Sequence, residues 1–376
     1  MNYVKLKDVC TINMGQSPSS DSYNENGHGV PFFQGNADFG ERYPVTRKWC
    51  SAPTKMAAPE DILISVRAPI GAMNYAKEEC CIGRGLAALT PNREKVAPEY
   101  IFWLLKGKNE ELNCKGTGST FKAIGRNILE ETLVPNISLE KQTECAIILE
   151  KTYRVILSRK QQLQKLDELV KARFIELFGD PVYNSKRLPI QRLCKLGSLD
   201  RGRSQHRPRN DPKLLNGPYP LIQTGEVASA GLYITKYKNT YSELGLRQSK
   251  MWSAGTLCIT IAANIAQTAI LTFDACFPDS VVGFLPNDSI NAIYMHYWFG
   301  FFQKILEKQA PQVAQKNINL KILSELNVIV PTQEKQEQFA AFVEQTDKSK
   351  LAIQQSLDKL KTLRKSLMQE YYGQGE

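Results

Sequence analysis

Residues 139–181 read LEKQTECAIILEKTYRVILSRKQQLQKLDELVKARFIELFGDP, and this stretch decides the fold. No Pro or Gly falls between Gln142 and Phe178, and Gly179 and Pro181 follow at once, so one unbroken helix is predicted up to the glycine. Its apolar residues recur with the seven, three, four and seven steps of a coiled coil, at Ile156, Leu163, Leu166, Val170 and Leu177. At about 1.5 Å per residue the helix is about 55 Å long. A core helix of a compact domain is the alternative, but this length favours pairing with a second helix.

A matching helix is predicted at residues 336–372, where the same apolar stripe recurs and Gly373 ends it. Lys350 and Arg364 interrupt this second stripe. Its apolar members are Val343, Ile353, Leu357, Leu360, Leu367 and Tyr371. Two such helices in one chain most simply pair with each other, and we expect an antiparallel coiled coil.

The repeat extends beyond the helices. Residues 55–92 align without a gap on 250–287 at an offset of 195, and Ile62–Val66 falls on Leu257–Ile261, both read as buried strands. Leu6, Val9, Ile12 and Gly15 match Leu193, Leu196, Leu199 and Gly202 at an offset of 187. The predicted fold is therefore α+β, with two α/β domains that are each followed by a long helix. The predicted boundaries are 1–140 and 181–333 for the domains, and 141–180 and 334–376 for the helices.

Composition narrows the classes of protein. The chain has 376 residues, with Lys+Arg 48 against Asp+Glu 38, a net charge of +10 that favours a polyanionic partner without proving one. Nine cysteines without a CxxC motif, and a start without an apolar leader, predict reduced thiols and a cytoplasmic protein. Met251–Phe273 carries no charge, but its first-half equivalent contains Glu60, Asp61 and Arg67, which argues against a membrane span.

No catalytic equipment is found. The chain lacks a phosphate-binding GxxxxGK[ST] loop, HExxH and GxSxG, and its three histidines, His28, His206 and His296, lie far apart. Asp200 with Asp211-Pro212-Lys213 resembles a metal-dependent nuclease constellation, but it lies in a loop and has no first-half counterpart. We therefore predict no catalytic residue, metal or cofactor. A nuclease or methyltransferase acting alone, and a helical scaffold that does not touch DNA, remain the alternatives.

The strongest candidate for nucleic-acid binding is the segment 201–209, because arginine forks pair well with phosphates and guanine edges. It contains Arg201, Arg203, Arg207 and Arg209, while its first-half equivalent, 15–20, offers the uncharged Gln16 and Ser17. A second surface is predicted at Thr117, Ser119 and Lys122, matched in the second half by Gln312, Gln315 and Lys316. The remaining candidates are Arg42, Arg47, Lys48, Arg67, Arg84, Arg126, Lys236, Lys238, Arg247, Gln248 and Lys250. Any one of these residues, taken alone, is more often an ordinary surface residue. The prediction therefore rests on the whole set taken together.

This organisation resembles the specificity (S) subunits of Type I restriction-modification systems over essentially the whole chain. The resemblance is carried by ARFIELFGDP at 172–181, and by LVP at 133–135 ahead of LEKQ at 139–142. A second copy has IVP at 329–331 ahead of EKQ at 334–336. ILISVR at 62–67 and GST at 118–120 are similar to that family's recognition domains.

The resemblance implies a non-catalytic reader of double-stranded DNA, with one domain for each half of a bipartite site. It further implies helices that act as a ruler and docking surface, two modification subunits that bind S-adenosylmethionine, and restriction subunits that use ATP and Mg. The second half lacks the Gly-Ser-Thr sequence, so base-contacting residues cannot be carried over one by one.

Overall fold

The computed structural model describes residues 2–118, 122–209, 211–262, 265–309 and 318–373. The chain divides into two compact units, with residues 1–160 and 355–376 in unit 1 and residues 161–354 in unit 2. Each unit combines β-sheets with short helices and contains part of both long helices. The predicted α+β class is therefore confirmed.

Unit 1 is built on an antiparallel four-stranded sheet in the order β2-β10-β7-β8, namely Cys10–Met14, Leu86–Pro91, Ile62–Ser65 and Met73–Tyr75. A second sheet has the order β3-β5-β4-β9-β6, namely Tyr23–Asn24, Trp49–Cys50, Val30–Phe33, Cys80–Ile82 and Met56–Ala57. β1 (Tyr3–Lys5) pairs with β11 (Leu133–Pro135). The short helices are α1 (Leu6–Val9), α2 (Pro98–Gly107), α3 (Asn109–Cys114) and α4 (Arg126–Glu130).

Unit 2 repeats this plan. Its main sheet has the order β13-β21-β18-β19-β15, namely Gly197–Arg201, Val281–Pro286, Leu257–Thr260, Thr268–Leu271 and Tyr233–Ile234. Its second sheet has the order β16-β14-β20-β17, namely Asn239–Tyr241, Leu215–Leu221, Ala275–Cys276 and Met251–Trp252. β12 (Ile190–Arg192) pairs with β22 (Asn327–Ile329). The short helices are α6 (Thr224–Ser229), α7 (Glu243–Arg247), α8 (Ala292–Gln309) and α9 (Leu320–Ser324).

The predicted repeat holds down to strand register. Ile64 of β7 pairs with Ala87, and Ile259 of β18 pairs with Val282. Each residue of the second pair lies 195 positions after its equivalent in the first pair. β7 and β18 are buried along their whole length, as predicted for continuous apolar runs. The uncharged stretch from Met251 forms strands, and among the described residues no helix is long and apolar enough to span a membrane.

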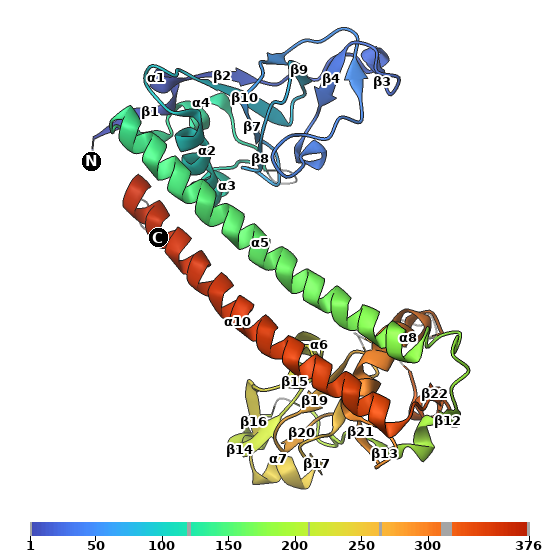
Figure 1. Cartoon of the computed structure of the whole chain (residues 1–376). Coiled ribbons are helices and arrows are strands. Elements are labelled where there is room, and N and C mark those ends of the chain that lie inside the picture. Colours follow the sequence, from blue (N-terminus) through green and yellow to red (C-terminus); the bar gives the residue numbers. More distant parts are fainter. Residues whose placement is uncertain (1, 119–121, 210, 263–264, 310–317, 374–376) are drawn as a thin grey trace. The chain divides into compact units, whose positions relative to one another are not determined.

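The two long helices are α5 (Leu139–Phe178) and α10 (Gln333–Tyr372), drawn green and red in Figure 1. They start two residues and one residue, respectively, before the predicted boundaries at 141 and 334. At α5 the Ser138 hydroxyl accepts a hydrogen bond from the backbone N–H of Lys141, which caps a first turn that the apolar stripe does not reach. Both helices end as predicted, with Gly179 at φ +76° and Gly373 at φ +62°.

Within each unit the helices run antiparallel. In unit 2 the Phe174 ring, near the end of α5, lies 5.4 Å from the Phe339 ring, near the start of α10. Lys350, expected to interrupt the stripe, forms a 2.7 Å ion pair with Asp167 of α5. In unit 1 the first turns of α5 share a core with the last turns of α10, through Cys145, Ala146, Leu149, Leu367, Met368, Tyr371 and Tyr372.

The predicted seam residues are all at least partly buried. Ile156, Val170 and Leu357 are buried. The others are partly buried, namely Leu163, Leu166, Leu177, Ile353, Leu360 and Leu367.

A buried glutamine near the start of each long helix accounts for the Gln of the repeated Glu-Lys-Gln sequence. The Gln142 side chain accepts a hydrogen bond from the N–H of Ala97, just ahead of α2, and donates one to the carbonyl of Ile137. Gln336 does the same with the N–H of Asn291, just ahead of α8, and the carbonyl of Pro331. Because a buried amide needs both partners, each glutamine fixes its long helix to the first turn of the domain helix.

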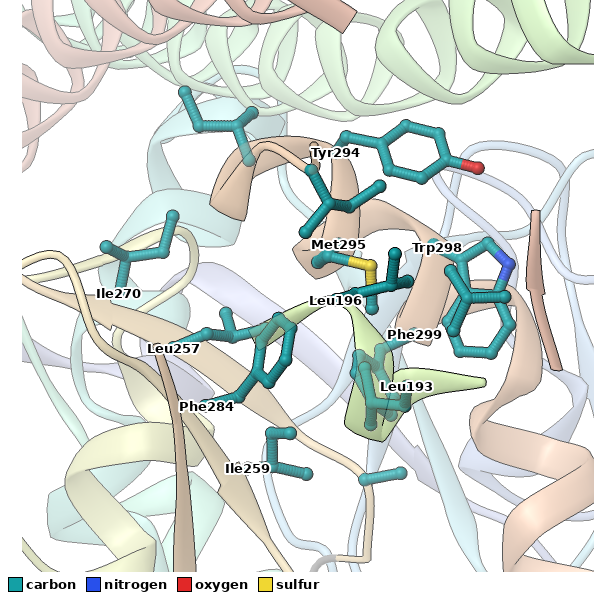
Figure 2. Close-up of a cluster of buried hydrophobic side chains, with 14 of the residues drawn as sticks. Leu193, Leu196, Leu257, Ile259, Ile270, Phe284, Tyr294, Met295, Trp298 and Phe299 are labelled. Atoms are coloured by element: carbon teal, nitrogen blue, oxygen red, sulfur yellow. The ribbon is translucent and has the colours of Figure 1, made fainter. Parts of the chain in front are cut away.

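The core of unit 2 lies between its main sheet and α8 (Figure 2). Leu257, Ile259 and Phe284 of the sheet and Trp298 and Phe299 of α8 belong to this one cluster. All five side chains are buried, and burying each apolar side chain contributes roughly 1.5–3 kcal/mol. This packing holds β13 and β21 in place, and the candidate binding loop leaves from the end of β13.

His296 of α8 predicts a pH-dependent stability. Its Nδ1 lies 3.0 Å from the Thr268 hydroxyl, and burial lowers its pKa to about 4, with Lys350 adding to the effect. The unfolded chain, with a histidine pKa near 6.5, takes up a proton first as the pH falls. We expect this site to cost up to about 3 kcal/mol of unfolding free energy between about pH 6.5 and pH 4, with the full stability present above pH 6.5.

Replacing His296→Gln should flatten that part of the pH profile in chemical denaturation, relative to wild type. His28→Gln, at an exposed position, is the control and should leave the profile unchanged. An unaltered profile in the His296 variant would contradict the prediction.

Candidate nucleic-acid interface

The arginine loop, residues 201–209, leaves β13 and is fixed by backbone hydrogen bonds to the segment that joins β20 and β21. Gly202 N–H donates to the carbonyl of Val281, and Arg203 N–H donates to that of Phe277. A Cβ at Gly202 would lie 2.3 Å from the Phe277 oxygen and 2.4 Å from the Pro278 oxygen. Only glycine therefore permits this close approach, which brings the loop onto the turn that contains Asp279.

The same anchoring recurs in unit 1. Gly15 N–H donates to Leu86 O and Gln16 N–H to Ile82 O, which are the equivalent atoms. The hydroxyl of Thr54 donates to Gln16 O at 2.7 Å, and that of Ser249 donates to Arg203 O at 2.9 Å. The two loops are thus equivalent parts of one repeated scaffold, although only the second is rich in charge.

Two carboxylates hold the cations around the arginine loop. Asp279 lies 2.6 Å from Arg209 Nη2 and 3.7 Å from Arg207 Nη2. Asp200 accepts a 2.9 Å hydrogen bond from Lys250 Nζ, which lowers the pKa of that carboxyl. Lys250 also lies 4.1 Å from the centre of the Trp252 ring.

Gln248 shapes the turn of the loop. Its side-chain oxygen accepts hydrogen bonds from the N–H groups of Gln205 and His206, at 2.7 and 3.0 Å. Its Nε2 is buried and has no hydrogen-bond partner among the described residues, nor has the buried hydroxyl of Ser204. The structure therefore brings together Arg201, Arg203, Arg207, Arg209, Gln248 and Lys250.

The two nuclease-like carboxylates, Asp200 and Asp211, form hydrogen bonds with nearby residues of the protein. Asp200 binds Lys250, while Asp211 accepts a hydrogen bond from the N–H of Lys213, which lowers its pKa, and another from His206. Among the described residues there is no group of three His, Cys, Asp or Glu arranged to hold a metal.

Unit 1 brings its candidates together in two groups. Arg84 N–H donates to the Ser17 hydroxyl, beside Gln16. Arg67 and Thr117 both form a β-bridge to Ala123, next to Lys122. Side chains in both groups are exposed, except that Ser17 is partly buried, so both could meet a ligand.

Other candidates lie apart from these groups. Arg42 packs on the Tyr75 ring and reaches Glu150 of α5, and Arg126 hydrogen-bonds the carbonyl of Ile12. Arg47 bonds the carbonyl of Ala37. Lys48 of unit 1 is exposed, and so are Lys236, Lys238 and Arg247 of unit 2. Ser119, Gln312, Gln315 and Lys316 lie outside the described residues.

Sequence reasoning missed Asp279 and Lys106. The signal for Asp279 is its alignment, at offset 195, with the candidate Arg84. Lys106 lies 4.0 Å from the centre of the Tyr153 ring and 4.9 Å from that of Trp103, and burial lowers its pKa to about 8. Its partners come from α2 and α5, so periodicity within one helix could not reveal this contact.

Two equivalent domains with anchored polar loops, and a pair of long helices, define a duplicated binding protein. The family described as Type I restriction modification DNA specificity domain matches residues 1–168 and again residues 193–362, and the chain belongs to this family. Both halves of the chain are thus members of one domain family.

Two relatives agree with this assignment. The chain is 41% identical over 160 residues to a Methanocaldococcus jannaschii protein provisionally named type I restriction enzyme MjaX specificity subunit. It is 25% identical over 273 residues to the MjaIX specificity subunit of the same organism. These matches cover 43% and 66% of this chain, but only 38% and 62% of the relatives' own lengths.

The fold is also that of solved structures. It matches the Type I restriction-modification S subunit from M. genitalium with a TM-score of 0.65 at 13% identity, covering 100% of this chain and 96% of that one. A chain from a structural study of complex assembly in the type I R-M system matches with a TM-score of 0.62 at 18% identity, covering 99% of this chain and 97% of that one.

Proposed function

We propose that this chain is the DNA-recognition subunit of a Type I restriction-modification complex and reads a bipartite site with one domain for each half. The observation that carries the proposal is the twofold match to the DNA specificity domain family. The arginine loop adds support, because its cations form one exposed surface suited to phosphates and base edges. The relatives and one solved neighbour bear the name of specificity or S subunit.

The two recognition domains are residues 1–140 and 181–333 in this proposal, and the helices at 141–180 and 334–376 set the spacing of the half-sites. In unit 2 the DNA contacts come from the arginine loop with Gln248 and Lys250, and in unit 1 from Gln16, Ser17 and Arg84 with Arg67, Thr117 and Lys122. Lys48, Lys236, Lys238 and Arg247 are secondary candidates. Arg42, Arg47 and Arg126 are weaker candidates, because each lies apart from these groups.

The chain works with partners in this proposal. Two modification subunits dock on the helices and transfer methyl groups from S-adenosylmethionine, and restriction subunits use ATP and Mg to cleave. The chain itself supplies recognition and no catalytic residue. The assembly acts in the cytoplasm, where its DNA substrate is.

The test is to exchange one domain. Residues 1–140 are replaced by the corresponding domain of another family member, and the chimera is combined with its modification subunits. Because residues 1–140 and 181–333 lie in different compact units of the chain, we expect sequencing of the methylated DNA to show one half-site changed and the other unchanged.

A reciprocal exchange of residues 181–333 is the matched control and should change the other half-site. A change in both half-sites from either exchange would contradict the modular reading. Methyl transfer or cleavage by this chain alone would indicate an enzyme instead, and absence of DNA affinity in the assembled complex would indicate a scaffold.

A further inference from the structure

Asp279 of unit 2 is the acidic residue that arginines of the arginine loop contact. Its two carboxylate oxygens face the guanidinium groups of Arg207 and Arg209, at 3.7 and 2.6 Å. Its backbone carbonyl accepts a third arginine, from Arg201 Nε at 3.0 Å. One acidic residue thus engages three of the four arginines of the loop, two through its charged carboxylate and one through its backbone carbonyl.

The equivalent position in unit 1 has the opposite charge. Arg84 aligns with Asp279 in the repeat. Its backbone N–H donates a hydrogen bond to the hydroxyl of Ser17, which lies in an uncharged loop. Unit 1 therefore has a cation on the turn and none on the loop, whereas unit 2 has its cations on the loop and an anion on the turn. The carboxylate is a feature of the second domain only, so the common scaffold does not require it.

We propose that Asp279 is an internal counter-ion that occupies Arg207 and Arg209 in the free protein and is displaced by a DNA phosphate. The proposal rests on the proposed function and adds a regulatory residue to it. Its consequence is lower affinity of unit 2 for DNA of arbitrary sequence, because a phosphate must compete with Asp279 before it gains the two arginines.

The exchange is feasible because the ion pairs are open to water. The Asp279 side chain is 37% exposed, and those of Arg207 and Arg209 are 55% and 46% exposed. Exposed ion pairs contribute little to stability, so their replacement costs little. Arg207 Nη1 also donates hydrogen bonds to the carbonyls of Ser204 and His206. These bonds hold the Arg207 side chain in place while a phosphate replaces Asp279 at Nη2.

The test compares Asp279→Asn with Asp288→Asn in the full chain, alone and assembled with its modification subunits. Asp288 is an exposed carboxylate of the same unit with no ion pair among the described residues, so the control makes the same change in net charge. Affinity is measured against salt concentration, on a duplex that carries the recognition sequence and on one that lacks it.

For Asp279→Asn we expect affinity for the non-target duplex to rise about 3- to 10-fold at low salt beyond the control. The slope of log affinity against log salt should steepen by up to about 0.9 for each added phosphate contact. Asp279→Ala, which also removes the acceptor oxygens, should show the same rise, and unchanged melting temperatures establish that the variants fold.

Equal behaviour of Asp279→Asn and Asp288→Asn would overturn the proposal. Weaker binding of the target with an altered half-site would also overturn it, because Asp279 would then be a reader of base amino groups. If wild type and all variants show no salt-dependent affinity even when assembled, the proposed function itself fails.

Discussion

Alanine at Arg201, Arg203, Arg207 and Arg209 together is expected to make the salt dependence of DNA binding much shallower. Each lost phosphate contact lowers the slope of log affinity against log salt by about 0.9, so four contacts account for up to about 3.6. The fall in affinity is increased by the carboxylates, since Asp279 loses both arginine partners and remains near the DNA as an unpaired negative charge.

The measurement is duplex binding by the assembled complex between about 50 and 200 mM salt, a range in which several phosphate contacts change affinity by orders of magnitude. The matched control replaces four other exposed cations of unit 2, Arg187, Arg192, Lys195 and Lys321, by alanine. If both variants have the same slope, the arginine loop is a solvated turn and general charge explains the binding. If a single arginine change alters one base preference, that residue reads a base.

Deleting one heptad from each long helix is expected to shorten the DNA spacer between the half-sites. Removal of 159–165 and 353–359 takes equivalent turns from α5 and α10 and keeps the three-four spacing of the seam, because the deleted length equals the repeat. Seven residues correspond to about 10.5 Å of helix. At about 3.4 Å per base pair, the preferred spacer should shorten by up to about three base pairs.

A smaller change is also consistent, because the helices need not follow the DNA axis and the domains must keep their rotational phase on the duplex. The measurement is the methylated sequence in the assembled complex. Deleting 159–165 alone is the control, and it should impair activity because the two stripes fall out of step. An active double deletion with the original spacer would show that the helices do not set the distance.

Local sequence was sufficient for the long helices. Their ends follow from Gly179 and Gly373, and the buried positions Ile156, Val170 and Leu357 follow the spacing of the apolar stripe, because both features depend on residues within a few turns. The repeat was equally readable, since Ile62–Ser65 and Leu257–Thr260 are buried strands in equivalent positions of the two sheets.

The site was only partly readable. The four arginines stand close together in the chain, so composition revealed the loop, and the same reasoning proposed Gln248 without showing that it shapes the turn. Arg42 illustrates the opposite case, because its packing on Tyr75 is a tertiary contact that no local pattern shows.

The sequence by itself determined the duplicated α+β plan, the two helices and the basic loop, because periodicity and composition are local or repeated properties. Only the tertiary structure placed Asp279 against Arg207 and Arg209, and Gln142 against the start of α2. Arg209 and Asp279 are 70 residues apart in the sequence, and Ala97 and Gln142 are 45 residues apart. The physical reason is that charges and buried amides interact only with groups that lie close to them in space. These distances are set by the folded arrangement of the sheets and helices and not by the order of residues in the chain.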